Sequence, residues 1–279
     1  MLEKIVSTLE SEDSLSGWQV REIDKRSSQL YVGLDRVESF RRVDSLAYEI
    51  EILVNRRAAA PKKGMVTGSA RFTLDPSALG RLDKELDQAM ASAALIENEA
   101  YAMTEVAGQV PQVPLSDLNL VKDPETVLRQ GAEILRQASA SEAQARFSAA
   151  EFFADSSKSR YFNSQGVQVL QESTLFSGEF VLLSKGKQAE SEVFKAFKRR
   201  RAEDVDFAAL ARESAEHGRR LTLAGLPKTG SYDVVFSGEA LENFFSWISS
   251  SASAASKYNR MTRFELGQEL VTTLPGASP

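Results

Sequence analysis

The chain has 279 residues, of which 42% are hydrophobic and 26% charged, and its formal net charge is -5. This acidic balance argues against a dedicated nucleic-acid-binding protein, whose domains are usually basic, and no run approaches the roughly 18 apolar residues of a membrane span. Zero cysteines exclude thiolate chemistry, and the single histidine, His217, excludes a multi-histidine metal site within one chain. We therefore expect a protein without a cofactor. Because no membrane span is evident, we also expect a cytoplasmic protein.

Residues 1–105 are typical of a sheet backed by a helix. Alternation of apolar and polar residues predicts strands, most clearly in YEIEILV. Asp75 and Pro76 then supply an N-cap and a proline at the first helical position, which predicts a helix over 76–95. The strands expected in this segment are 18–23, 28–34, 36–43, 48–54 and 68–74.

The stretch GQVPQVPLSDLNLVKDPE contains three prolines and little periodicity. Such composition is typical of a linker or of a connection that lies along the surface. We therefore predict a linker over 106–123 and a domain boundary within 105–123.

Residues 124–225 combine helices with an antiparallel meander. Asp123 and Pro124 repeat the cap-then-proline signal and predict a helix over 124–139, while Asp206 caps another expected over 206–223. Between these helices, extended runs are expected at 145–155, 159–172 and 175–184, with a turn at residues 163–166. The sequence thus predicts an α+β fold with mainly antiparallel sheets and packed helices, in two to three segments.

The order of these pieces resembles the TldD/TldE family, also called PmbA. The resemblance is carried by RYFNSQGV, by the strand and capped helix after it, by LPKTGSYDVVFSGEAL, and by REIDKRSSQLYVGLDRVESFRRV and GSARFTL in the first segment. It implies a metallopeptidase-related protein associated with proteolysis and peptide maturation, in a family once described as modulators of DNA gyrase. Family members are longer, so residues 226–279 are expected to be the start of a truncated C-terminal domain. The positions that match family motifs are Asn163, Ser164, Gly166, Pro227, Gly230 and Tyr232.

In the catalytic branch of this family, TldD, the motif His-Glu-x-x-x-His binds a metal. On this chain Ser246 takes the place of the first histidine, Trp247 of the glutamate and Ser251 of the second histidine. Serine hydroxyls are poor ligands for a transition metal, and an indole cannot act as a base. The resemblance therefore implies the non-catalytic TldE branch, with no enzymatic activity of its own and a TldD-like partner.

The stretch LENFFSWISSSAS predicts a helix over 239–256 with an apolar stripe. Such a stripe is either core or a subunit interface, which leaves self-association open as well as pairing with a partner. The basic run KAFKRRR is followed at once by acidic residues and is typical of a solvated strand end, and His217 is expected to be a surface residue. The candidate core or interface residues are Leu241, Phe244, Phe245, Trp247 and Ile248.

Two functional hypotheses follow. The first is a non-catalytic subunit that pairs with a TldD-like metallopeptidase acting on unfolded peptides. The second is a stand-alone binding or regulatory protein of the gyrase-modulator type. An active peptidase ranks last, because the metal ligands are missing.

Overall fold

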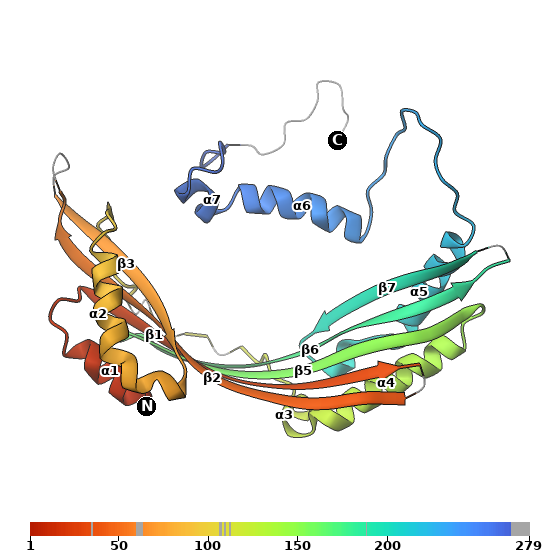
Figure 1. Cartoon of the computed structure of the whole chain (residues 1–279), viewed down its shortest axis with the longest axis horizontal. Coiled ribbons are helices and arrows are strands. Elements are labelled where there is room, and N and C mark those ends of the chain that lie inside the picture. Colours follow the sequence, from red (N-terminus) through yellow and green to blue (C-terminus); the bar gives the residue numbers. More distant parts are fainter. Residues whose placement is uncertain are drawn as a thin grey trace. The chain divides into compact units, whose positions relative to one another are not determined.

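The computed structural model describes residues 1–268 except 35, 60–63, 106, 107, 109, 112 and 188. It divides into two compact units, Met1–Ala224 and Gly225–Pro279. Among its described residues, the first unit contains one antiparallel sheet of seven strands in the order β4-β3-β2-β1-β5-β6-β7. Figure 1 labels all of these strands except the two-residue β4. The predicted α+β class with mainly antiparallel pairing is confirmed. The strands are β1 (Gly17–Gly33), β2 (Arg36–Arg57), β3 (Met65–Leu74), β4 (Asn98–Glu99), β5 (Ala145–Asn163), β6 (Gln168–Lys185) and β7 (Glu190–Arg199).

Four of these strands are unusually long. β1, β2, β5 and β6 contain 17, 22, 19 and 18 residues, whereas strands of globular proteins usually have about 3–10. The prediction of separate strands at 18–23 and 28–34, and at 36–43 and 48–54, is therefore wrong, because each pair is one continuous strand. The polar residues 24–26 that suggested a break pair with β2 on one side and β5 on the other. Backbone pairing on both sides continues a strand regardless of side-chain polarity.

Helices of the first unit cover one face of this sheet. The helix predicted over 76–95 begins as a 3-10 turn, Pro76–Arg81, whose N-cap Asp75 accepts hydrogen bonds from the Ser77 and Ala78 N–H groups. The predictions over 124–139 and 206–223 are confirmed to within one or two residues, whereas α1 and α3 were not predicted. The helices are α1 (Leu2–Glu10), α2 (Leu82–Ala93), α3 (Leu118–Lys122), α4 (Pro124–Ala140) and α5 (Phe207–Leu221), with a short 3-10 turn at Ala202–Asp204.

Two separate hydrophobic cores lie on the same face of the sheet. In β1, Trp18 and Val20 belong to the first core, and Leu30 and Val32 belong to the second. All four have even numbers, and side chains of one parity share a face of a strand. α1 and α2 pack on the first core, and α4 and α5 pack on the second. Three of the long strands, β1, β2 and β5, thus contribute side chains to both cores.

The second core is built around four phenylalanines from three strands and a helix. Their ring centroids lie 5.3–6.3 Å apart, mostly edge to face, an arrangement that adds to the gain from burial alone. α4 approaches this cluster closely at Gly131, where an added Cβ would lie 3.1 Å from the Phe207 ring. The four residues are Phe152, Phe176, Phe197 and Phe207.

Between the two cores the same face is polar. Glu22 has a side chain only 8% exposed and forms an ion pair with Arg160 at 2.5 Å. Burial raises the pKa of the nearby Tyr48 phenol, and the charge and hydrogen bond of Glu22 raise it further. A buried carboxylate at this position is stabilised by its partners, because an unpaired one would be costly.

Residues 1–105 and 124–225, which the sequence suggested as separate segments, contribute strands to the same sheet, since β1 pairs with both β2 and β5. Part of the expected linker also contacts this sheet. Leu115 forms a parallel bridge with Ser173, and the Asp117 N–H donates to the Thr174 hydroxyl.

The second unit contains α6 (Glu239–Ser251) and α7 (Ala254–Tyr258). The single helix predicted over 239–256 is therefore wrong beyond Ser251. Ser253 adopts an extended backbone and its hydroxyl accepts a hydrogen bond from the Ser256 N–H, so it caps the start of a new helix. Serine favours this role because its hydroxyl competes with the regular helical hydrogen bonds.

Neighbouring phenylalanines of β5 test the assignment of the two faces. Phe152 is fully buried, whereas Phe153 on the opposite face is half-buried beside Tyr31. We expect Phe152→Ala to lower the free energy of unfolding by about 3–5 kcal/mol, through lost burial and a residual cavity. The matched control Phe153→Ala should cost about 1 kcal/mol. Urea denaturation measures both, and equal losses would contradict the assignment.

The raised pKa of Tyr48 predicts a pH dependence. Because the folded-state pKa lies above the unfolded value of about 10, this contribution to stability is complete below pH 10 and is lost as the pH rises through the folded-state pKa. We expect the parent protein to lose stability more steeply than Tyr48→Phe above pH 10, as measured by urea denaturation at several pH values. Parallel curves would contradict this prediction.

Candidate functional site

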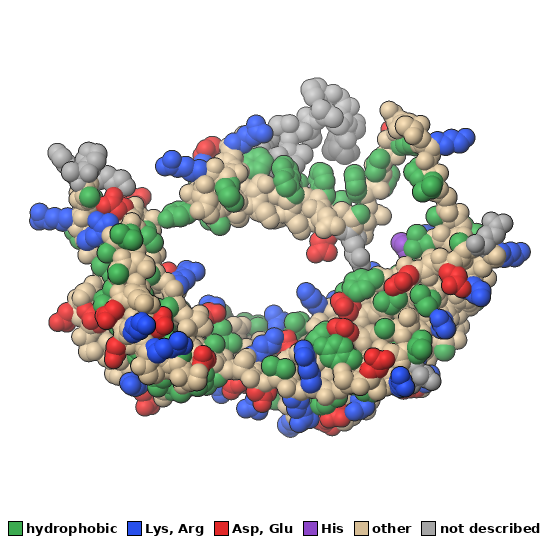
Figure 2. Space-filling model, in the orientation of Figure 1, with side chains coloured by type: hydrophobic (Ala, Val, Ile, Leu, Met, Phe, Trp, Pro, Cys, Tyr) green, Lys and Arg blue, Asp and Glu red, His purple; other side chains and the backbone are tan. Residues whose placement is uncertain are grey.

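The apolar stripe predicted on residues 239–256 lies on α6 and is largely exposed. The exposed fractions are 53% for Phe244, 55% for Phe245 and 65% for Trp247. Phe244 stacks on Phe236 at 6.1 Å and meets Phe245 edge to face at 6.0 Å. Figure 2 shows apolar side chains along α6. Leu241 is also exposed, and Ile248 is partly buried. Exposed aromatic clusters of this kind are typical of interaction surfaces.

The positions that correspond to the metal motif also lie on α6. Ser246 and Ser251 are five residues apart, which is about 140° around a helix of 3.6 residues per turn, so this helix does not bring their side chains to one side. Trp247 follows Ser246 directly. Among the residues that the structure describes, no three His, Asp or Glu side chains form a group that could hold a metal ion. The lone histidine, His217, is on α5 in the other unit and is exposed.

The motif positions of the first unit form the turn between β5 and β6. The Asn163 carboxamide oxygen accepts hydrogen bonds from the N–H groups of Gln165 and Val167, both at 3.0 Å. The Ser164 hydroxyl accepts from the Trp18 N–H at 3.2 Å, which ties the turn to the start of β1. Gly166 has φ of +79°, a conformation that favours glycine. These residues hold the end of the sheet together.

The motif positions of the second unit lie before α6. Residues 231–237 form neither a helix nor a strand. Pro227 and Gly230 are exposed. The Tyr232 hydroxyl donates to the Lys228 carbonyl at 2.6 Å. The turn at Asn163 and this segment belong to different units.

The face of the sheet opposite the helices carries a polar network that the sequence analysis did not identify. The Tyr161 hydroxyl donates to the Gln19 side chain at 2.7 Å, and Gln19 donates to Glu51 at 2.5 Å. Arg71 forms an ion pair with Glu51 at 3.0 Å. These side chains line a hollow of about 360 Å³. Their odd numbers within β1, β2, β3 and β5 are a signal of a common face, but only once the strand register is known.

No helix among the described residues combines the length and the apolar character that a membrane span requires. No protein-family model and no curated protein matches the sequence.

The antiparallel sheet with helices on one face gives the chain the fold of TldE and of proteins described as modulators of DNA gyrase. The resemblance expected from the sequence is thereby confirmed at the level of the fold.

Among solved structures, the chain is similar to TldE from Thermococcus kodakarensis, with 14% sequence identity and a TM-score of 0.60 over 77% of this chain and 46% of that one. It is also similar to a candidate modulator of a DNA gyrase from Thermotoga maritima, with 12% identity and a TM-score of 0.63 over 82% of this chain and 50% of that one. A third, from Bacteroides thetaiotaomicron and described in the same way, has 12% identity and a TM-score of 0.59 over 77% and 49%. The chain spans about half the length of these proteins, and at such identities the likeness shows the fold alone.

The side chains at the motif positions predict that the chain retains no zinc. One histidine and no thiol leave mainly oxygen ligands, which favour harder ions. After dialysis, elemental analysis should find less than about a tenth of an equivalent of zinc, an expectation based on the missing nitrogen and sulfur ligands. A TldD-like protein with an intact His-Glu-x-x-x-His motif, dialysed in parallel, is the control. Stoichiometric zinc in this chain would contradict the assignment.

Proposed function

We propose that this chain is a non-catalytic subunit that pairs with a longer, TldD-like metallopeptidase and helps to enclose that enzyme's active site. The partner supplies the metal and its ligands. Enclosure restricts access to extended, unfolded peptides, because folded chains do not fit, and a protease gains specificity by such exclusion. In this scheme the chain acts in proteolysis or peptide maturation through its partner.

The observation that carries this proposal is the exposed aromatic cluster of α6. Phe244, Phe245 and Trp247 each expose more than half of their surface. Burying one large apolar side chain contributes about 1.5–3 kcal/mol, so covering this cluster with a partner would strongly favour association. Aromatic residues are enriched where interfaces gain most of their binding energy.

The chemistry at the neighbouring positions supports the same proposal. α6 carries serine and tryptophan at the positions that correspond to the metal motif, and residues 218–279 contain no histidine. A helix with this surface and without ligands is suited to binding another protein. The fold shared with TldE from Thermococcus kodakarensis is consistent with this role.

The alternative is a stand-alone regulatory protein. Two of the similar structures are described as candidate modulators of DNA gyrase, which is the observation that favours it. The net charge of -5 disfavours direct contact with DNA. Binding to purified gyrase in the absence of any TldD-like protein would support this alternative.

Co-expression tests the partner role. The chain and a TldD-like protein with an intact motif from the same genome should co-purify as a complex, and the peptidase activity should require both. We expect Phe245→Ser to weaken the complex by about 30-fold or more, as a central interface aromatic contributes about 2 kcal/mol or more. The measurement is the dissociation constant from titration calorimetry.

A matched control comes from Leu223, which is 86% exposed and lies outside α6. Leu223→Ser should leave the dissociation constant unchanged. Failure of the two chains to associate, or full peptidase activity of the longer protein without this chain, would overturn the proposed function.

A further inference from the structure

β7 is the last strand of the sheet and, among the described residues, pairs only with β6. It contains 10 residues, which gives it a long free edge. Such an edge presents unpaired backbone groups that can pair with another strand. Natural proteins usually shorten or cover such edges, so a long one needs an explanation.

The hydrogen bonds at the β6–β7 turn show which residues of β7 direct their backbone outward. The Gly186 N–H donates to the Ala189 carbonyl at 2.8 Å, in register with the strand pairs that follow, from Lys185 with Glu190 onward. Hydrogen-bonded and non-hydrogen-bonded pairs alternate along an antiparallel ladder. Residues with even numbers from Glu190 to Lys198 therefore direct their N–H and C=O groups away from β6.

The charges on β7 are separated by sign along the strand. Glu190 and Glu192 lie at its start, while Lys195, Lys198 and Arg199 lie in its second half. A parallel copy of the strand would place like charges side by side, which is destabilising. An antiparallel copy would place opposite charges side by side. The edge is thus complementary to itself in one direction only.

One register satisfies the backbone and the charges together. With a two-fold axis at Phe194, Glu190 of one copy lies opposite Lys198 of the other, twice over, and the two Phe194 side chains meet at the centre. Phe194 is 54% exposed, so its contact with a second copy would remove apolar surface from water. In this register the even-numbered residues, whose backbone groups point outward, oppose one another, and no like charges are directly opposed.

The ion pair that Glu190 already forms with Lys185 competes only weakly with a contact to a second copy. Lys185 lies 3.7 Å from Glu190, and the two side chains are 81% and 72% exposed. Exposed pairs of this kind contribute little to stability. Glu190 can therefore exchange Lys185 for Lys198 of a second copy at small cost.

The helix layer also accommodates this pairing. α5 packs over β6 and β7, and the Ser191 hydroxyl donates to the Gly218 carbonyl of that helix at 2.8 Å. With strands about 4.8 Å apart, α5 helices of two copies would lie about 10 Å from each other. That spacing matches the usual distance of about 8–10 Å between packed helices.

We propose that two copies of this chain associate through antiparallel pairing of their β7 strands, with Phe194 at the two-fold axis and Glu190 opposite Lys198. The resulting sheet is continuous across both copies. This surface is distinct from α6, so the proposal goes beyond the pairing with a TldD-like partner. It also gives a role to the basic residues that end β7.

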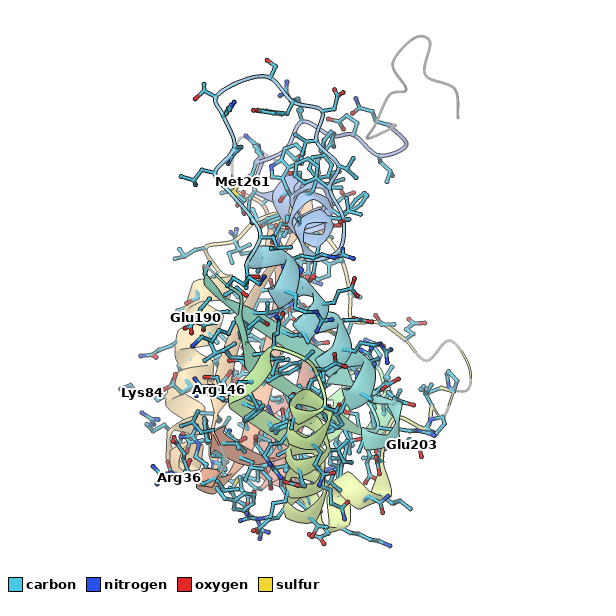
Figure 3. All side chains as sticks on the ribbon, turned by 90° about the vertical axis from the view of Figure 1, so that its right-hand side faces the viewer. Arg36, Lys84, Arg146, Glu190, Glu203 and Met261 are labelled. Carbon is cyan, nitrogen blue, oxygen red and sulfur yellow. The ribbon has the colours of Figure 1, made fainter. Side chains whose placement is uncertain are left out.

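Charge exchange tests this proposal on the full chain. By sedimentation velocity, the parent protein should form a dimer, and Glu190→Lys and Lys198→Glu should each weaken dimerisation by about tenfold or more, because each change creates two like-charged contacts across the two-fold axis. A mixture of the two single variants should dimerise, since each supplies the charges that the other lacks. The double variant Glu190→Lys with Lys198→Glu should also regain dimerisation, because opposite charges again face each other. Lys84→Glu on α2, labelled with Glu190 in Figure 3, is the control for the same change in charge elsewhere.

Three results would overturn the proposal. A parent protein that stays monomeric removes the basis for β7 pairing. Dimerisation that is insensitive to the β7 variants but lost in Phe245→Ser assigns self-association to α6. A monomer that captures an extended peptide along β7 shows that the edge binds another chain instead of a second copy. The partner role is tested separately, because Glu190→Lys should leave the complex with a TldD-like protein intact if the two surfaces are independent.

Discussion

Long strands that serve two hydrophobic cores must keep their alternation of side chains in phase from one end to the other. In β1, Trp18 and Val20 contact one core, and Leu30 and Val32 contact the other, with a polar stretch between them. A slip of one residue in that stretch would move the second pair to the opposite face. The described bulges lie beyond the polar stretch, at Tyr31/Val32 and Phe147/Ala149. The regular pairing between the cores therefore fixes where both helix layers can form.

The fold class could be predicted from the sequence because alternation and helix caps are local signals. Asp75, Asp123 and Asp206 each accept backbone hydrogen bonds at the start of the helical turns they were expected to cap. The continuity of the strands could not be predicted in this way. Residues 24–26 have no apolar side chain, and only their pairing with β2 and β5 keeps them extended. The extended conformation of these residues is therefore set by tertiary pairing and not by local sequence, as is often the case for strands.

The candidate site likewise has features that the sequence could predict and features that it could not. The apolar stripe of α6 could be predicted from helical spacing. The absence of metal ligands at Ser246, Trp247 and Ser251 follows from the family resemblance and stays a prediction. Phe244 and Phe245 lie on α6 as the stripe predicted, but whether such a stripe is core or surface depends on what else packs there. The sequence could not locate the network of Gln19, Glu51 and Tyr161, because its members come from three strands. Nor could it show that β7 forms an edge, since strand order depends on distant pairing.

The two proposals assign contacts with other chains to two kinds of surface. α6 presents exposed aromatic side chains, which gain most from burial. β7 presents backbone groups and separated charges, which gain most from a strand in a defined direction. Among the described residues, β7 is held in place by its pairing with β6 and by α5, which packs over both strands.

Hydrogen exchange along a urea titration tests this shared construction most directly. If the long strands couple the two cores, amides of α2 over the first core and of α4 over the second should lose protection at the same urea concentration, with the same free energy. Loss of protection in one helix at a clearly lower urea concentration than in the other would show that the cores unfold independently, and would contradict the account.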